Sequence, residues 1–210
     1  KAYIYIIHQS IMSTPAKPFA AAILDRLKAI TDKVVEDLGY CIENNVAEEE
    51  DDNSTMSPLV IPFTQSTSKT KLVGQLQKVA KSWTELTASL NTLSRSAMII
   101  NIRTMCDLLS AMNNDVNAFS TGMPDGKAKL KFLEHVSKLK SSSVQLKITI
   151  SVRASSDGDD NLTDTDKKLE SLYETMGEAF DVITHSDRVF NDLDFKQTSS
   201  SSTWNTISWN

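Results

Sequence analysis

The chain has 210 residues, of which 40% are hydrophobic and 23% are charged, and its formal net charge at pH 7 is −5. This content suits an ordered chain that buries a sizeable core. The acidic balance argues against a nucleic-acid partner, because neutralising phosphates requires a concentrated basic face. No run of residues approaches the roughly 18 consecutive apolar residues of a membrane-spanning helix. We expect one helical-bundle domain over residues 1–198, followed by a Ser-rich link and a Trp-containing tail over residues 199–210.

The N-terminal segment, residues 1–12, is apolar and rich in β-branched residues. This composition predicts a strand, and the start of a packed helix is the alternative. The segment has no small-residue cleavage site after an apolar core, so it is not typical of a signal peptide. A chain that begins with Lys1 favours a processed or trimmed product.

A first helix is predicted from about Lys17 to Val46. Its inner stripe follows helical spacing and consists of Ile23, Leu27, Ile30, Val34, Leu38, Cys41 and Asn45. The acidic run at residues 48–52 repels itself and predicts an exposed loop, which continues through Pro58 and Pro62.

The stretch from Leu72 to Phe119 carries the strongest helical pattern in the chain. Apolar residues recur at alternating steps of four and three, at Leu72, Leu76, Val79, Trp83, Leu86, Leu90, Leu93, Ala97 and Ile100, and again from Met105 onward. No proline interrupts the pattern. It predicts one long helix that begins near Ser68 or Thr70, or two helices in series with a break near Asn101. Gly122, Pro124 and Gly126 predict the turn that ends this stretch.

Residues 127–154 permit two interpretations. A helix is predicted to begin near Lys127 with Leu130, Leu133, Val136 and Leu139 facing inward. Residues 143–154 then alternate strictly between apolar and polar, which favours a strand, although helical spacing also continues through Leu146 and Ile150. The lysines at 127, 129, 131, 138 and 140 are interpreted as the solvated face of a helix, with a phosphate or lipid-headgroup patch as the alternative.

A last helix is predicted from about Thr163, with Asp166 stabilising its first turn. Its stripe is Leu169, Leu172, Met176, Ala179, Ile183, Ser186, Phe190 and Leu193. Together these segments predict a mainly α fold, an elongated antiparallel four- or five-helix bundle. A small β element could form from residues 2–7, residues 143–154 or the C-terminal tail.

No catalytic or metal-binding set is visible in the sequence. The three histidines are far apart and not in a ligand spacing, and no nucleophile, histidine and acid form a recognisable set. Cys41 and Cys106 fall on or beside inner stripes, where cysteine usually acts as a small core residue. We therefore expect no enzyme activity, no cofactor, no metal and no small-molecule substrate.

The segment LVGQLQKVAKSWTELTASLNTL, residues 72–93, resembles the tryptophan-bearing long helix of helical pore-forming toxins, the cytolysin A, haemolysin BL and xenorhabdolysin group. The resemblance covers about a tenth of the chain. It implies long antiparallel helices, secretion and action on membranes without catalysis. Members of that family insert an apolar hairpin into the membrane, and this sequence contains no such hairpin.

Two functions follow as expectations. The first is a membrane-acting toxin or toxin component, soluble before membrane contact. The alternative is a helical protein–protein interaction module, such as an effector, adaptor or assembly subunit. The partners would be a lipid membrane or a protein, with self-association also expected. The candidate contact residues are apolar and aromatic and lie at the two ends of the chain, at Tyr3, Tyr5, Ile6, Ile7, Trp204 and Trp209.

Overall fold

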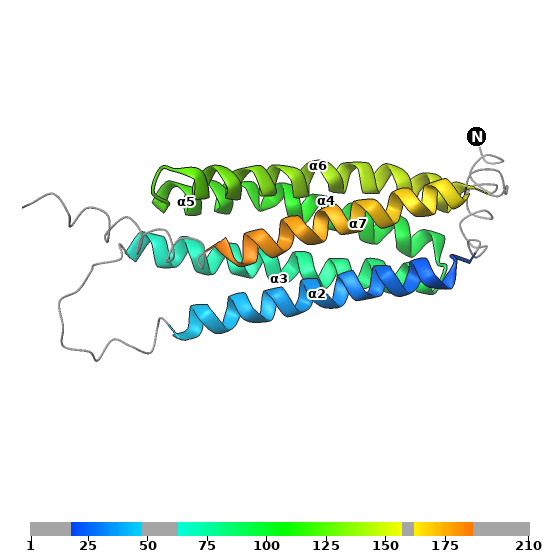
Figure 1. The fold of residues 1–210 in the computed structure, drawn as a ribbon, viewed down its shortest axis with the longest axis horizontal. Coiled ribbons are helices and arrows are strands. Elements are labelled where there is room, and N and C mark those ends of the chain that lie inside the picture. The colour runs from blue at the N-terminus through cyan, green and yellow to red at the C-terminus, as the bar shows by residue number, and fades with distance from the viewer. Residues whose placement is uncertain (1–17, 48–62, 157–161, 187–210) are drawn as a thin grey trace, which may run out of the picture.

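The computed structural model describes residues 18–47, 63–156 and 162–186 (Figure 1). All regular secondary structure in these ranges is helical, so the predicted mainly α fold is confirmed. The helices are α2 (Ala21–Ala47), α3 (Phe63–Asn91), α4 (Arg95–Ala111), α5 (Asn113–Gly122), α6 (Lys127–Ser155) and α7 (Leu162–Thr184). Residues 2–7 and the C-terminal tail, both named as sources of a β element, lie outside the described residues.

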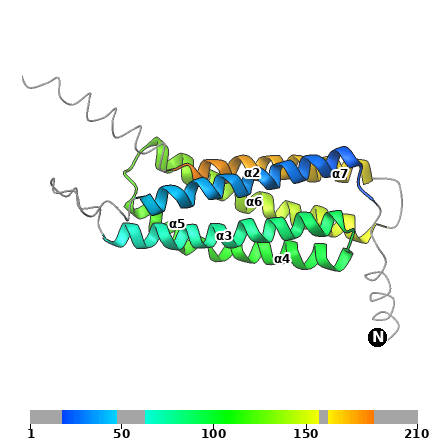
Figure 2. The same ribbon diagram turned by 90° about the horizontal axis from the view of Figure 1, so that it is seen from below.

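The helices form an elongated bundle with their axes along one direction (Figures 1 and 2). α2 packs against α3 and α7, α3 packs against α4 and α5, and α6 packs between α4 and α7. The core runs along the inside of this arrangement, and every helix contributes to it. The predicted elongated antiparallel bundle is therefore correct.

Trp83 of α3 lies at the centre of the core and is fully buried. Its ring meets Tyr173 and Phe180 of α7 edge to face, with centroid distances of 5.5 and 6.4 Å, a geometry that aromatic quadrupoles favour. The buried Tyr173 hydroxyl is 3.3 Å from Thr87 Oγ1, which is 2.7 Å from Thr31 Oγ1. Burial raises the pKa of Tyr173 far above its ordinary value. This hydroxyl chain joins α2, α3 and α7 across the core.

The prediction of one long helix from Leu72 to Phe119, or of a break near Asn101, is wrong. α3 begins earlier than predicted, at Phe63, and ends at Asn91. The chain then turns through Leu93, which has a positive φ of 57°, and α4 returns along α3. Asn101 lies inside α4, where its amide donates to the Glu85 carbonyl at 3.0 Å. The apolar pattern continues through the turn because both arms of the hairpin face the same core.

The predicted strand at residues 143–154 is also wrong, because α6 is one helix as far as Ser155. Leu146, Ile150 and Arg153 point inward at the helical spacing of four and three. The polar residues between them do not disturb the helix, since Ser and Thr hydroxyls bond back to preceding carbonyls, as Thr149 does to Gln145 at 3.0 Å. Leu130, predicted to face inward, is 68% exposed, the highest value among the large apolar residues that the structure describes.

α2 matches its predicted position to within a few residues, and α7 begins one residue before the predicted Thr163. α7 ends at Thr184, and the predicted stripe residues Phe190 and Leu193 lie outside the described residues. The predicted inner residues Leu27 and Val34 of α2, and Leu169 and Met176 of α7, are buried. α2 lies against α7 and α3, so its apolar stripe closes one side of the bundle.

Candidate protein-interaction face

Most of the large exposed apolar residues lie on one helix. The described residues expose six of them, and four are on α6, at Leu130 (68% exposed), Val144 (52%), Ile148 (59%) and Val152 (51%). The last three are each one helical turn apart, so they form a single stripe. The remaining two, Val35 and Ile100, lie on α2 and α4. Isolated exposed apolar residues are ordinary, but an aligned set on one helix marks an interaction surface.

Lysines border this stripe on both sides. α6 carries six lysines and a single acidic residue, Glu134, although the whole chain has a net charge of −5. Helical periodicity places Lys140 and Lys147 along one border, and Lys131 and Lys138 along the other. We name this surface the α6 face and define it by the stripe Leu130, Val144, Ile148 and Val152 together with the lysines at 127, 129, 131, 138, 140 and 147. It presents an apolar stripe over residues 144–152 with lysines on both sides, and Leu130 lies further along the same side, beyond the exposed Glu134 and Ser137.

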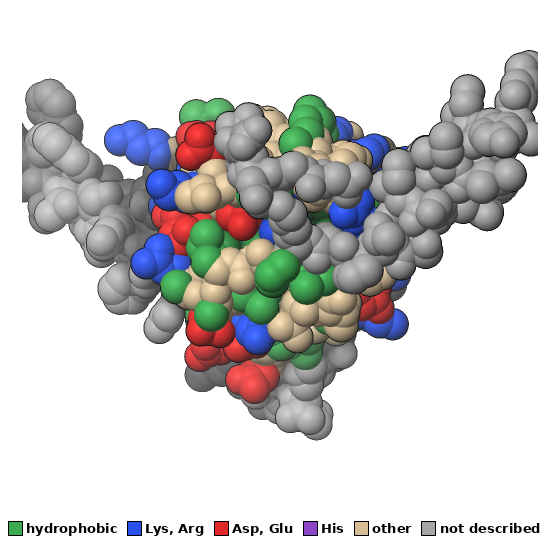
Figure 3. Space-filling view, turned by 90° about the vertical axis from the view of Figure 1, so that its right-hand side faces the viewer, with side chains coloured by type: hydrophobic (Ala, Val, Ile, Leu, Met, Phe, Trp, Pro, Cys, Tyr) green, Lys and Arg blue, Asp and Glu red, His purple; other side chains and the backbone are tan. Residues whose placement is uncertain are grey.

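The end of the bundle where α6 finishes and α7 begins looks different. Figure 3 shows apolar side chains there scattered among acidic and basic ones, without a surface of one sign. Interspersed charges of this kind are typical of a surface that stays in water. The concentration of lysine on α6 is thus a local property of that helix.

The inward side of α6 holds the face in place. Arg153 is fully buried, and its Nε donates to Asp166 Oδ1 of α7 at 2.7 Å. Its guanidinium also donates to the Pro18 carbonyl at 3.3 Å and lies 4.3 Å from the centroid of the Phe19 ring. These contacts connect α6, α7 and the residues that precede α2. The sequence pattern does not indicate this pair, because Arg153 lies in the predicted strand and Asp166 is expected only to stabilise the first turn of the last helix.

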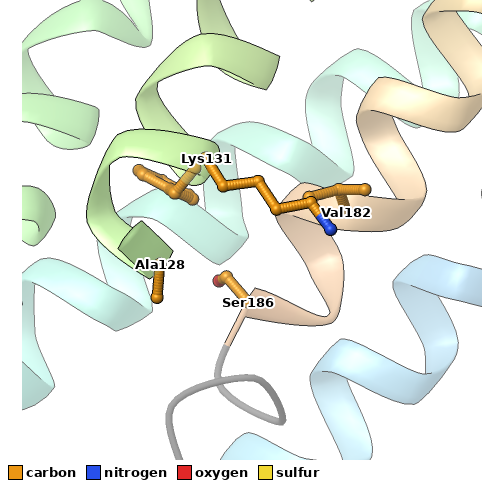
Figure 4. A pocket seen from close by; sticks show the side chains of 5 residues that line it. Ala128, Lys131, Val182 and Ser186 are labelled. Carbon is orange, nitrogen blue, oxygen red and sulfur yellow. The ribbon is translucent and has the colours of Figure 1, made fainter. Parts of the chain in front are cut away.

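A small cleft opens beside the α6 face, between the start of α6 and the end of α7. It is lined by Ala128, Lys131, Phe132, Val182 and Ser186, and Figure 4 shows Lys131 reaching across it towards Val182. One amine and one hydroxyl do not make a set of convergent polar groups, which a small-molecule site requires. The cleft is better described as the edge of the α6 face.

A cluster of ionisable residues lies at the opposite seam, between α2 and α7. Asp37, Asp181 and His185 place one potential ligand atom each within 4.8 Å of the others. Lys33 Nζ lies 3.7 Å from Asp37 Oδ2 and 3.5 Å from Asp181 Oδ1. Burial raises the pKa of Asp37, and Lys33 only partly opposes this effect. Sequence analysis missed the cluster, although the four-residue spacing of Asp181 and His185 was a visible signal.

The remaining predictions concern the terminal contact residues, the two cysteines and a membrane-spanning helix. Tyr3, Tyr5, Ile6, Ile7, Trp204 and Trp209 lie outside the described residues. Cys41 and Cys106 are buried and not disulfide-bonded, as expected of core cysteines. Burial raises the pKa of the Cys106 thiol, which donates to the Ser143 carbonyl at 3.4 Å. Among the described residues, no helix combines the length and apolarity needed to cross a bilayer.

Comparison with known proteins gives one match. A family model described as F-actin binding matches residues 67–184, more than half of the chain, so the chain belongs to this family. The matched region runs from α3 to the end of α7 and includes the whole α6 face, whereas α2 lies outside it. No curated protein and no solved structure matches significantly. The family favours the predicted protein-interaction module over the predicted toxin.

Proposed function

We propose that this chain binds actin filaments through the α6 face. Two independent observations support the proposal. The chain belongs to the F-actin binding family, and the largest aligned set of exposed apolar residues lies on a helix inside the matched region. The observation that carries the proposal is the apolar stripe with its lysine border, because this exposed apolar surface is the part of the bundle that a protein partner would cover.

The stripe and the lysines would act in different ways. At ~1.5 Å per residue, the stripe from Val144 to Val152 is about 12 Å long, and Leu130 lies about 21 Å before it on the same side of α6. Burying an aliphatic side chain contributes roughly 1.5–3 kcal/mol, so a few of these residues are sufficient to supply most of the affinity. The lysines would steer an acidic partner and fix its orientation, and the strength of this effect would depend on salt.

Co-sedimentation with actin filaments tests the proposal. The variant Val144→Ser/Ile148→Ser/Val152→Ser removes three stripe residues that face solvent, so the fold should be retained. We expect roughly hundredfold weaker binding, because three lost apolar contacts at about 1 kcal/mol each sum to about 3 kcal/mol. Val35→Ser on α2 is the matched control, since Val35 is a similarly exposed valine away from the α6 face. We expect Val35→Ser to bind as the wild type does.

Two results would contradict the proposal. One is a wild-type chain that stays in the supernatant at filament concentrations of tens of micromolar. The other is a wild-type chain that sediments with anionic lipid vesicles and not with filaments, which would identify the lysine border as a headgroup site.

The toxin resemblance, secretion, self-association and the absence of enzyme activity stay predictions, because neither the described residues nor the family match bears on them.

A further inference from the structure

We propose that Asp37, Asp181 and His185 form a binding site for a divalent transition-metal ion at the seam between α2 and α7. The proposal is independent of actin binding, because this seam involves other helices and other residues than the α6 face. It begins from the cluster geometry, in which the three side chains converge to within 4.8 Å from two different helices.

The spacing of Asp181 on α7 and His185, which directly follows α7, suits a metal ion. Asp181 and His185 are four residues apart, so their side chains lie over the same turn and point to the same side. His185 Nδ1 lies 2.8 Å from the Asp181 carbonyl oxygen and 3.1 Å from Asp181 Oδ1. Nδ1 is therefore the ring nitrogen that lies beside the Asp181 carboxylate. In the tautomer that carries its proton on Nε2, the Nδ1 lone pair would be available to a metal ion shared with this carboxylate.

The third ligand, Asp37, has one carboxylate oxygen that accepts no hydrogen bond. Asp37 is only 6% exposed, and its Oδ2 atom has no hydrogen-bond partner. The nearest cation, Lys33 Nζ, is 3.7 Å away, which is beyond hydrogen-bond length. A buried carboxylate oxygen without a donor is costly, and a bound metal ion would satisfy it directly.

Lys33 is the competitor for this site. It lies between the two carboxylates, but its side chain is 58% exposed and can move into solvent. Ligand bonds of about 2.0–2.2 Å to zinc require the three ligand atoms to approach one another to roughly 3.5 Å. Small rotations of Asp181 and His185 would achieve this, and water would complete the coordination. A nitrogen ligand with two carboxylates suits Zn²⁺ and its first-row neighbours better than calcium.

The stacked ring of Tyr40 supports the histidine from the α2 side. Its centroid lies 4.5 Å from that of the His185 ring, so the imidazole already rests against α2. A metal ion here would fasten the second half of α2 to the end of α7. The site would therefore connect a helix outside the family match to the matched bundle.

Zinc titration of the chelator-treated chain, followed by calorimetry and by thermal unfolding, tests the site. We expect saturable binding of one zinc ion and a higher melting temperature. His185→Gln should weaken binding at least tenfold, whereas His135→Gln, a histidine on α6 outside the cluster, should not. Cobalt(II) should bind without a thiolate charge-transfer band, which separates this site from Cys41 and Cys106.

Lys33→Met provides a second test, in which the expected result is a gain of zinc affinity that misfolding could not produce. Removing the competing amine should tighten zinc binding several-fold, and Asp37→Asn should abolish the gain. The proposal is overturned if the wild type shows no saturable zinc binding. It is also overturned if His185→Gln binds zinc as tightly as the wild type, or if Lys33→Met leaves the affinity unchanged.

Discussion

The two sides of α6 place chemically similar side chains in opposite environments. Ile148 and Ile150 are two residues apart and chemically identical, yet the first is 59% exposed and the second is fully buried. The inward side of α6 packs against α4 and α7 and fixes the bundle. The outward side offers the same kind of side chain to solvent, where it contributes nothing to folding. Apolar residues on one helix can thus serve two purposes, and only their orientation separates stability from binding.

Cationic residues on α6 show the same division. Arg153 on the inward side is fully buried and paired with Asp166, whereas Lys138 and Lys140 on the outward side are exposed. A buried charge must be matched, because removing one partner leaves an uncompensated ion in the core. An exposed lysine costs little and remains available to a partner. The comparison predicts separable effects on stability and on binding.

The largest effect should come from breaking the buried pair. Arg153→Met leaves the Asp166 carboxylate buried without its partner, so we expect a loss of about 3–5 kcal/mol in the free energy of unfolding. Arg153→Met/Asp166→Leu removes both charges and should recover most of the loss. Urea denaturation measures both variants. A loss below about 1 kcal/mol in the single variant would show that the pair does not fasten α6 to α7.

The two isoleucines provide the matched comparison. Ile150→Ala creates a cavity in the core and should cost roughly 2–5 kcal/mol of stability, with little change in filament binding when the folded fraction is taken into account. Ile148→Ala should change stability by less than about 0.5 kcal/mol and should weaken filament binding several-fold. Denaturation and co-sedimentation on the same samples separate the two effects. Equal stability losses in both variants would contradict the assignment of the two sides.

The lysine border should contribute a smaller, salt-dependent part of binding. Lys140→Glu/Lys147→Glu should weaken filament binding about tenfold at low salt, and the difference should shrink towards 0.5 M salt as the charges are screened. Lys78→Glu on α3 is an exposed control away from the α6 face. The account of the border would be wrong if the reversal at Lys78 weakened binding as much as the reversals on α6.

The smallest expected effect is the contribution of Asp37 to the pH dependence of stability, measured with a chelator present. Burial raises the pKa of Asp37, so its contribution to stability is fully present below the unfolded-state pKa and is lost as pH rises through the folded-state pKa. Asp37→Asn should therefore be at least as stable as the wild type at pH 7, with a gap that closes on acidification below about pH 4. Denaturation midpoints across pH test the direction. The prediction would be contradicted if the stability of the wild type increased relative to that of Asp37→Asn as the pH rises.

The sequence was sufficient to predict α2, α7, the first half of α6 and most of the core, because the spacing of residues such as Leu27, Trp83 and Met176 indicates the inward side of a helix. It was not sufficient to predict the turn at Leu93, because no glycine or proline marks it. Ser94 was the available signal. Its hydroxyl accepts from the Ala97 amide at 3.4 Å and caps α4, and a capping serine before an apolar run indicates a helix start.

The α6 face was hidden for a different reason. Val144, Ile148 and Val152 lie four residues apart, and together with the inward residues Leu146 and Ile150 they produce an apparent alternation that resembles a strand. Which apolar residues face solvent depends on the neighbouring helices, and a single sequence does not contain that information. The Asp37, Asp181 and His185 cluster likewise needs the packing of α2 on α7 to become visible.

Photo-crosslinking from the α6 face tests the central claim most directly. A benzophenone amino acid at position 148 places the reactive group on the stripe, and the same residue at position 35 places it on α2. The account predicts a crosslink to actin from position 148 in the presence of filaments and none from position 35. Crosslinking from position 35 alone, while both variants sediment with filaments, would show that the chain binds actin by another surface.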